Sequence, residues 1–261
     1  MSALTPSQVE QFVEEGFVKL ERAVPEGVGE QCRREIWEAT GCDPSDPSTW
    51  SQPFIRLERL ATPAFRAAAN TPSLLEAFDQ LVGAGRWIAL TGLGTFPLRF
   101  PSTDPPQDAG WHVEAGFAGP QGEIRVNMRS RGRALLILFL FSEVDSDDAP
   151  TEVRIGSHLD VPRFLSAAGD DGMAWMELCQ QVVPASAGRR VALATGAIGD
   201  VYLCHPFLVH RGTGHRGSTP RFMAQPPLRS IDPLDLDSPN PTPAARAVIN
   251  GLGRPQDRKF G

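Results

Sequence analysis

The chain has 261 residues, of which 41% are hydrophobic and 21% are charged, and its formal net charge is −6 at pH 7. This composition is typical of a globular protein with a large core, and the negative charge argues against a nucleic-acid-binding surface. The sequence has no apolar run near the roughly 20 residues that cross a bilayer, and its acidic, amphipathic start does not resemble a secretory signal. We therefore expect a cytoplasmic protein that binds neither nucleic acid nor membrane and keeps its four scattered cysteines reduced.

Helices are expected mainly in the N-terminal third of the chain. Thr5 before Pro6, with Gln8 three positions after Thr5, is a capping-box start, and Gly16 suits the end of the same helix. Apolar residues at helical spacing and further Thr-Pro starts predict the other helices. The predicted helices cover about 6–15, 26–40, 72–81 and 243–251, and a short strand is predicted at 17–20.

From residue 86 the pattern changes to short strands separated by Gly, Pro and Asp. The predicted strands cover 87–100, 122–130, 134–144, 151–155, 190–195, 201–210 and 221–228. The apolar run LLILFLF is typical of a strand that is buried on both faces. A few helices followed by many strands predict an α+β chain built around an antiparallel barrel or sandwich. We expect one domain over 1–261, with a mostly helical layer at 1–85, a strand core at 86–229 and a tail at 230–261.

The five histidines carry the strongest chemical signal. The segment WHVE places His112 and Glu114 two residues apart, so on an extended backbone both side chains point to one face and could reach one metal ion. His210 lies far downstream, and Arg221 follows it by eleven residues. Two histidines and one carboxylate on a metal form the facial triad of non-haem Fe(II) oxygenases, which leaves positions open. A guanidinium at Arg221 could bind a ligand carboxylate through two parallel hydrogen bonds.

With these residues the chain resembles the phytanoyl-CoA dioxygenase family of Fe(II)/2-oxoglutarate oxygenases. The resemblance runs from LTPSQVEQFVEEGFVKL through WHVEAGF and RIGSH to HPFLVHRG and PRFMAQPPL. It implies a double-stranded β-helix, which is a jelly-roll or cupin-like barrel, with an N-terminal helical layer. It also implies that His112, Glu114 and His210 are the catalytic Fe(II) ligands, and that Arg221 binds the distal carboxylate of 2-oxoglutarate. Dioxygen is the other co-substrate of such enzymes.

The remaining histidines receive less specific predictions. His205 lies five residues before His210, an odd number, so on a regular strand it faces the other way. The resemblance implies that His205 does not bind the metal and instead contacts a ligand residue or packs in the core. His158, in the GSH segment that resembles a recurring loop of the family, is either structural or faces the substrate. His215 lies in a Gly-rich loop, and we expect it to be exposed to solvent.

Two positions depart from the family pattern. The carboxylate is Glu114 where the family usually has Asp, and halogenating relatives have Gly or Ala there, so a carboxylate argues against halogenation. Gly212 stands two residues after the distal histidine, where many members have Ser. A hydrogen bond to the co-substrate is then missing, and Arg221 is expected to carry more of its binding.

Further co-substrate contacts are expected on two strands. Over 122–133, apolar residues alternate with Asn127 and a series of arginines, which is typical of a half-buried strand with one cationic face. That face is either exposed to solvent, or Asn127 or one of the arginines lines the barrel mouth and contacts 2-oxoglutarate or an anionic substrate. Arg99, on the strand before the HVE segment, is a similar candidate.

The resemblance implies oxidation, most often hydroxylation, of a C–H bond in a small molecule, with conversion of 2-oxoglutarate to succinate and CO₂. A free small molecule, such as an amino-acid derivative or an intermediate of secondary metabolism, is favoured over a CoA thioester because the acidic chain offers few basic groups for CoA phosphates. Two alternatives stay open. One is a cupin-like metalloenzyme that does not use 2-oxoglutarate, and the other is a non-catalytic binding module on the same fold.

Overall fold

The computed structural model describes residues 2–104, 106 and 109–253. Its helices are α1 (Pro6–Glu15), α2 (Glu26–Thr40), α3 (Pro63–Ala69), α4 (Pro72–Val82), α5 (Pro162–Leu165), α6 (Trp175–Ala185) and α7 (Pro243–Leu252), with 3₁₀ turns η1 (Pro47–Thr49) and η2 (Ser157–Leu159). Its strands are β1 (Phe17–Leu20), β2 (Phe54–Leu57), β3 (Phe96–Arg99), β4 (Phe117–Ala118), β5 (Ile124–Val126), β6 (Leu135–Leu140), β7 (Thr151–Arg154), β8 (Met173–Ala174), β9 (Val191–Ala194), β10 (Val201–Cys204), β11 (His210–Arg211), β12 (Met223–Ala224) and β13 (Pro227–Leu228). None of the described helices combines the length and the apolar character that crossing a membrane requires.

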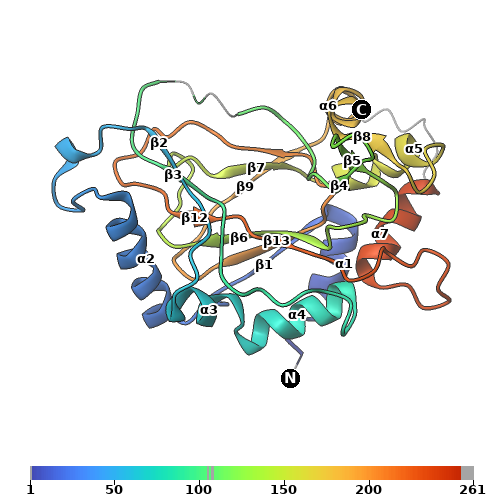
Figure 1. Cartoon of the computed structure of the whole chain (residues 1–261), viewed down its shortest axis with the longest axis horizontal. Helices are drawn as coiled ribbons and strands as arrows, with labels where there is room; N and C mark the ends of the chain where they lie inside the picture. Colours follow the sequence, from blue (N-terminus) through green and yellow to red (C-terminus); the bar gives the residue numbers. More distant parts are fainter. Residues whose placement is uncertain (1, 105, 107–108, 254–261) are drawn as a thin grey trace.

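Antiparallel sheets form the centre of the molecule (Figure 1). The larger sheet has the order β1-β10-β6-β12, and β13 also pairs directly with β6. The smaller sheet has the order β11-β7-β9, and the remaining strands form the pair β2-β3 and the three-stranded sheet β4-β5-β8. All the pairings are antiparallel. The chain is thus α+β with antiparallel sheets, which confirms that part of the prediction.

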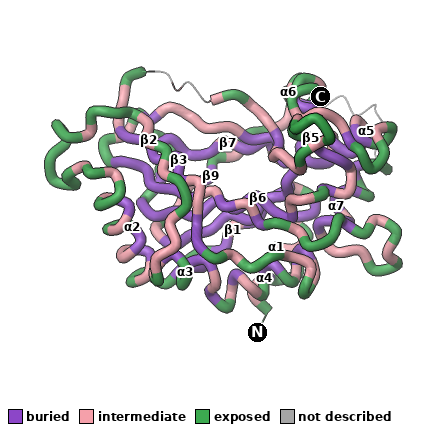
Figure 2. The backbone as a smooth tube through the Cα atoms, in the orientation of Figure 1, coloured by how far each residue is buried: buried purple, intermediate pink, exposed green. Residues whose placement is uncertain are grey.

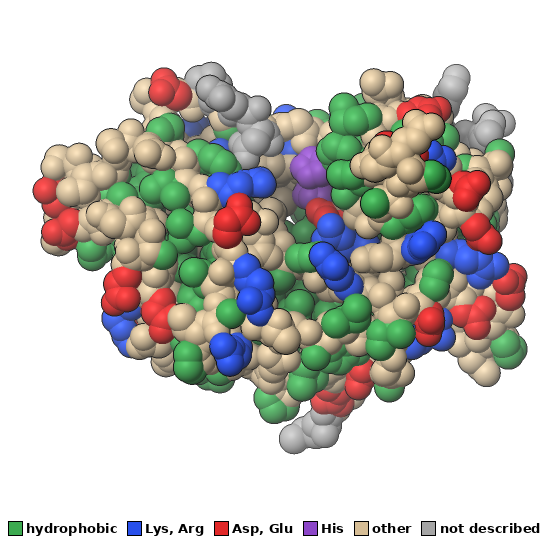
Figure 3. Space-filling view, viewed as in Figure 1, with side chains coloured by type: hydrophobic (Ala, Val, Ile, Leu, Met, Phe, Trp, Pro, Cys, Tyr) green, Lys and Arg blue, Asp and Glu red, His purple; other side chains and the backbone are tan. Residues whose placement is uncertain are grey.

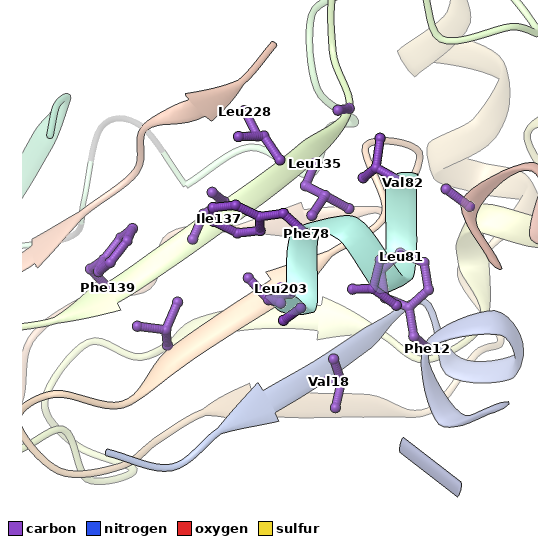
Figure 4. Packing of buried hydrophobic residues seen from close by; sticks show 14 of the residues in the cluster. Phe12, Val18, Phe78, Leu81, Val82, Leu135, Ile137, Phe139, Leu203 and Leu228 are labelled. Atoms are coloured by element: carbon purple, nitrogen blue, oxygen red, sulfur yellow. The ribbon is translucent and has the colours of Figure 1, made fainter. Parts of the chain in front are cut away.

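The apolar run of β6 is buried at every position, as predicted, and Figure 2 shows this strand inside the molecule. Alternate side chains of β6 pack in two different hydrophobic clusters. Leu135, Ile137 and Phe139 belong to the cluster that includes residues of α1 and α4, which Figure 4 shows packed against the sheet. The residues between them, such as Leu138, pack in a second cluster with β7 and β9 of the smaller sheet. Because its side chains pack in both clusters, β6 connects the helices with both sheets. Each fully buried Leu, Ile or Phe side chain stabilises the fold by about 1.5–3 kcal/mol.

The N-terminal helices agree closely with the sequence. Thr5 accepts a hydrogen bond from Gln8 N–H, the reciprocal bond completes the capping box, and α1 ends at Gly16 with φ +90°. The first 85 residues also give strands: β1 pairs with β10 at the edge of the larger sheet, and β2 pairs with β3. This N-terminal part is therefore a helical layer that also extends the sheets.

Several predicted strands are shorter than expected. The segment 87–100 is a strand only at its end, because Gly92 (φ +157°) and Gly94 (φ +155°) bend the preceding chain. The segment 201–210 divides into β10 and β11, and Pro206 between them has no N–H to donate to a neighbouring strand. Helices α3 and α6 were not predicted, although Thr62-Pro63 repeats the Thr-Pro start of α1. The C-terminal helix α7 is confirmed.

Candidate metal centre

Three side chains with metal-binding chemistry meet where the segment 112–114 pairs with β11. The N–H of His112 donates to the carbonyl of His210 at 3.0 Å, and the N–H of His210 donates back at 2.9 Å. Directly opposed residues point to the same face, and the two imidazole centroids lie 4.4 Å apart. Oε1 of Glu114 lies 3.4 Å from Nε2 of His210. One ligand atom of each of the three residues lies within 4.8 Å of the others.

Hydrogen bonds fix which nitrogen of each ring is protonated. Nδ1 of His112 lies 2.8 Å from the carbonyl oxygen of Gly110, and Nδ1 of His210 lies 2.9 Å from that of Leu208. A carbonyl only accepts, so each neutral ring carries its proton on Nδ1 and has its lone pair on Nε2. In His210 this lone pair faces the carboxylate of Glu114, and a cation between two such donors stabilises them. The donor set therefore fits a divalent metal.

Glu114 is ionised and held in place. Burial acts to raise the pKa of Glu114, but the contact with His210 and the charge of Arg133 outweigh it and lower the pKa to about 2. Nη2 of Arg133 lies 2.9 Å from Oε2 of Glu114. The backbone N–H of Glu114 donates to the carbonyl of Pro206 at 3.1 Å. The carboxylate is thus negatively charged at neutral pH, as a metal ligand must be.

The three residues open onto a cavity of about 550 Å³. Figure 3 shows histidine atoms beside a hollow in this face of the molecule. Trp175 and Met176 at the start of α6 line it with apolar surface, whereas Arg56 of β2 adds a cationic group. Trp175 also donates its indole N–H to the carbonyl of Val113 at 2.7 Å, so α6 holds the segment between the first two candidate ligands.

Arg221 and Arg99 line the same cavity and form a cross-strand pair. Arg221 is only 1% exposed, and its guanidinium donates to the carbonyls of Ala149, at 2.8 Å, and Pro97. These bonds fix a buried positive charge next to the metal-binding side chains. A Cβ at Gly212 would lie 2.9 Å from Nη2 of Arg99, so the glycine leaves the space that the Arg99 guanidinium occupies.

Asn127, which the sequence suggested as a contact of 2-oxoglutarate, is not among the residues that line this cavity. The side-chain amide of Asn127 donates to the carbonyl of Asp170 at 2.9 Å and accepts from the N–H of Arg131 at 3.0 Å. These two hydrogen bonds hold two loops together. The arginines of this segment are held by the protein rather than free on a solvated face. Their partners are the carbonyls of Asp171 and Gly172 for Arg125, Asp237 for Arg129, the ring of Phe117 for Arg131, and Glu114 for Arg133.

His205 and His158 lie outside the metal-binding group and are buried. His205 is fully buried, its Nε2 lies 3.2 Å from the carbonyl of Ala244, and its Nδ1 accepts the N–H of Phe207. Nε2 of His158 lies 3.0 Å from the carbonyl of Val13. The two rings lie 5.2 Å apart. The structure therefore favours the structural interpretation of His158.

His215 was expected on the surface, and that expectation is wrong because it is only 3% exposed. The loop folds back so that His215 forms an antiparallel β-bridge with Asp148. Nε2 of His215 lies 2.7 Å from the carbonyl oxygen of Thr219. Glycines around a histidine therefore did not indicate exposure here. Burial lowers the pKa of His215.

Two residues at the site, Arg56 and Trp175, were missed from the sequence, and Arg133 was expected only as one of several arginines of its segment. The contact of Arg133 with Glu114 depends on how a turn is folded, and Arg56 lies on a strand that was not predicted. Trp175 starts an unpredicted helix, for which the apolar residues at helical spacing in WMELCQQVV were the available signal.

No protein-family model and no curated protein sequence matches the chain. Among solved structures it is similar to SnoK, a non-haem α-ketoglutarate-dependent carbocyclase from nogalamycin biosynthesis, with 18% identity, a TM-score of 0.57, and coverage of 90% of this chain and 88% of SnoK. It is also similar to HygX from Streptomyces hygroscopicus with nickel, 2-oxoglutarate and hygromycin B bound (18% identity, TM-score 0.52, coverage 85% and 86%). EctD from S. alaskensis with 2-oxoglutarate and 5-hydroxyectoine gives 18% identity, a TM-score of 0.58, and coverage of 89% and 78%. The chain therefore has the fold of these 2-oxoglutarate-binding proteins.

Proposed function

We propose that the protein is a non-haem Fe(II)/2-oxoglutarate-dependent dioxygenase of the phytanoyl-CoA dioxygenase type. The observation that carries this proposal is that the ligand set His112, Glu114 and His210 shares one cavity with the buried guanidinium of Arg221. We further propose that the two packed antiparallel sheets form a double-stranded β-helix and that residues 1–261 form a single catalytic domain.

The two imidazoles and the carboxylate would hold Fe(II), with Nε2 of each ring and Oε1 of Glu114 as donors. When bound, the iron supplies the oxidising chemistry that couples conversion of 2-oxoglutarate and O₂ into succinate and CO₂ to attack on a C–H bond. The protein's own residues keep the Nδ1 protons on backbone carbonyls, hold the carboxylate ionised, and give the reaction a cavity partly closed by α6.

Arg221 would bind the distal carboxylate of 2-oxoglutarate. Its guanidinium is fixed by backbone carbonyls before any ligand arrives, so little conformational entropy is lost on binding. Arg99, across the strand pair, is a second cationic group for the same carboxylate. It occupies the space that the missing side chain of Gly212 leaves, and so compensates for the Ser of many family members.

The substrate is proposed to be a free small molecule that is hydroxylated, of the kind found in natural-product biosynthesis. Three of the similar solved structures are a protein from nogalamycin biosynthesis, a protein with hygromycin B bound and a protein with 5-hydroxyectoine bound. Trp175 and Met176 offer an apolar surface next to the candidate ligands. A carboxylate at Glu114 argues against halogenation.

The proposal is tested by the 2-oxoglutarate requirement for succinate release. Arg221→Ala should raise that requirement about 100-fold, since losing one partner of a buried charged pair costs about 2–5 kcal/mol. The matched control is Arg216→Ala, which removes an exposed arginine paired with Asp147. An unchanged requirement in Arg221→Ala would contradict the assignment of Arg221 as the residue that binds the distal carboxylate of 2-oxoglutarate.

A further inference from the structure

Arg133 contacts the segment that carries the candidate carboxylate ligand at two points. Its Nη2 lies 2.9 Å from Oε2 of Glu114, and its Nε donates to the carbonyl of Ala115 at 3.3 Å. The side chains of Arg133 and Glu114 are 16% and 15% exposed. A pair this well shielded from water is ordered more strongly than a surface ion pair.

The backbone under Arg133 is also fixed. The N–H of Arg133 donates to the carbonyl of Ser130 at 3.2 Å, and the Ser130 hydroxyl donates to the carbonyl of Arg133 at 2.8 Å. Ser130 and Gly132 have φ values of +47° and +83°, which close the turn tightly. The next residue, Ala134, donates to the carbonyl of Leu228 at 2.7 Å. The guanidinium is therefore directed at Glu114 by a fold-determined turn.

The two oxygens of Glu114 have different neighbours. Oε2 faces Arg133, whereas Oε1 faces Nε2 of His210. Glutamate has one more rotatable bond than the Asp that the family usually carries, so an unrestrained Glu114 has more ways to present one oxygen or both. Arg133 removes that freedom.

The number of oxygens matters for an octahedral metal. Two histidines and one carboxylate oxygen leave three positions, which a 2-oxo acid, through two oxygens, and dioxygen can share. A carboxylate that bound through both oxygens would leave only two positions. Such a site would force the 2-oxo acid to compete with the second oxygen of Glu114.

We propose that Arg133 is a positioning residue that holds Oε2 of Glu114, so that Glu114 offers only Oε1 to the metal and keeps the positions for the 2-oxo acid open. This inference rests on the proposed function. It predicts that loss of Arg133 weakens 2-oxo acid binding while the metal itself remains bound.

The test is an anaerobic titration of the full-length protein, first with Co(II) and then with 2-oxoglutarate. Arg133→Met should bind Co(II) as tightly as the unmodified protein but 2-oxoglutarate about tenfold more weakly, the smaller end of the effect of losing an outer partner of a metal ligand. Arg133→Lys, which keeps the charge, should recover part of the loss. The matched control is Arg131→Gln, two residues away and stacked on Phe117, which should bind both ligands normally.

Two results would overturn the inference. One is an Arg133→Met protein that binds 2-oxoglutarate like the unmodified protein, since Glu114 would then need no help. The other is equal loss of Co(II) and 2-oxoglutarate with a lower Tm and no recovery in Arg133→Lys, which indicates a purely structural role. If the unmodified protein binds no metal, or binds Co(II) but no 2-oxoglutarate, the proposed function fails instead.

Discussion

The molecule contains two close pairs of histidines with opposite surroundings. His112 and His210, 4.4 Å apart, direct Nδ1 to carbonyls two residues before them in the chain and lie beside an ionised carboxylate at a cavity. His158 and His205, 5.2 Å apart, are buried and reach carbonyls of α1 and α7. His205 and His210 are only five residues apart in the sequence. The partners of each ring, rather than the residue type or its place in the chain, therefore separate a metal ligand from a structural residue.

The second pair joins the ends of the chain to the core. Val13 lies in α1 and Ala244 in α7, so His158 holds α1 against η2, and His205 holds α7 against the segment that precedes β11. The comparison predicts that changes in the first pair affect chemistry and that changes in the second affect stability. The following predictions test this division in order of decreasing effect.

The largest effect is expected for His210→Ala. Removing one of three ligands should lower succinate formation by more than the roughly 100-fold that loss of an outer partner can cost. The Tm should stay close to that of the unmodified protein, because the ring lies at the cavity and anchors neither terminal helix. Comparing activity with thermal unfolding checks both statements, and a large drop in Tm would break the division.

His205→Ala is expected to lower stability and to leave the metal centre intact. It leaves a cavity in the core and removes the partner of the Ala244 carbonyl, so the free energy of unfolding should fall by about 3 kcal/mol. Urea unfolding measures this loss. The protein that remains folded at low temperature should bind metal normally. Loss of metal binding without loss of stability would assign His205 to the site instead.

A smaller effect on the free energy of unfolding is expected when the pH is lowered. Burial lowers the pKa of His205 to about 4, while the carbonyl of Ala244 partly opposes the shift. The unfolded chain takes up the proton as pH falls through about 6.5, and the native protein takes it up only near the lowered pKa, so stability falls between these values as pH decreases.

One such group changes the free energy of unfolding by up to about 1.4 kcal/mol per pH unit, or about 2 kcal/mol from pH 7 to pH 5. The His205→Gln protein lacks this titration and should show a flatter pH dependence by that amount. Equal slopes in the two proteins would mean that the pKa of His205 is the same in the native and unfolded states.

Local signals allowed much of the architecture and the pair His112 and Glu114 to be predicted, whereas His210 came from the family resemblance. The Thr-Pro starts gave α1, α4 and α7, and the uninterrupted apolar run gave β6, because capping and burial act over a few neighbouring residues. The spacing of His112 and Glu114 placed both on one face, and the pairing of His112 with His210 then brought the third residue to them.

The remaining features depend on long-range folding, which no local pattern contains. The carboxylate partner of Arg133 follows from the turn at Ser130 and Gly132, while the neighbouring Asn127 in the same segment ties loops together away from the cavity. His215 is buried because its loop folds back on Asp148, a contact between distant parts of the chain.

The most direct test of the central claim is anaerobic absorption spectroscopy of the metal-free protein as Fe(II) and then 2-oxoglutarate are added. The account predicts a weak visible charge-transfer band that forms only after 2-oxoglutarate is added and is lost in His210→Ala. Iron binding without the band would contradict the 2-oxoglutarate assignment and favour another metalloenzyme. Failure to bind iron would contradict the metal centre itself and leave a small-molecule-binding module on an oxygenase fold.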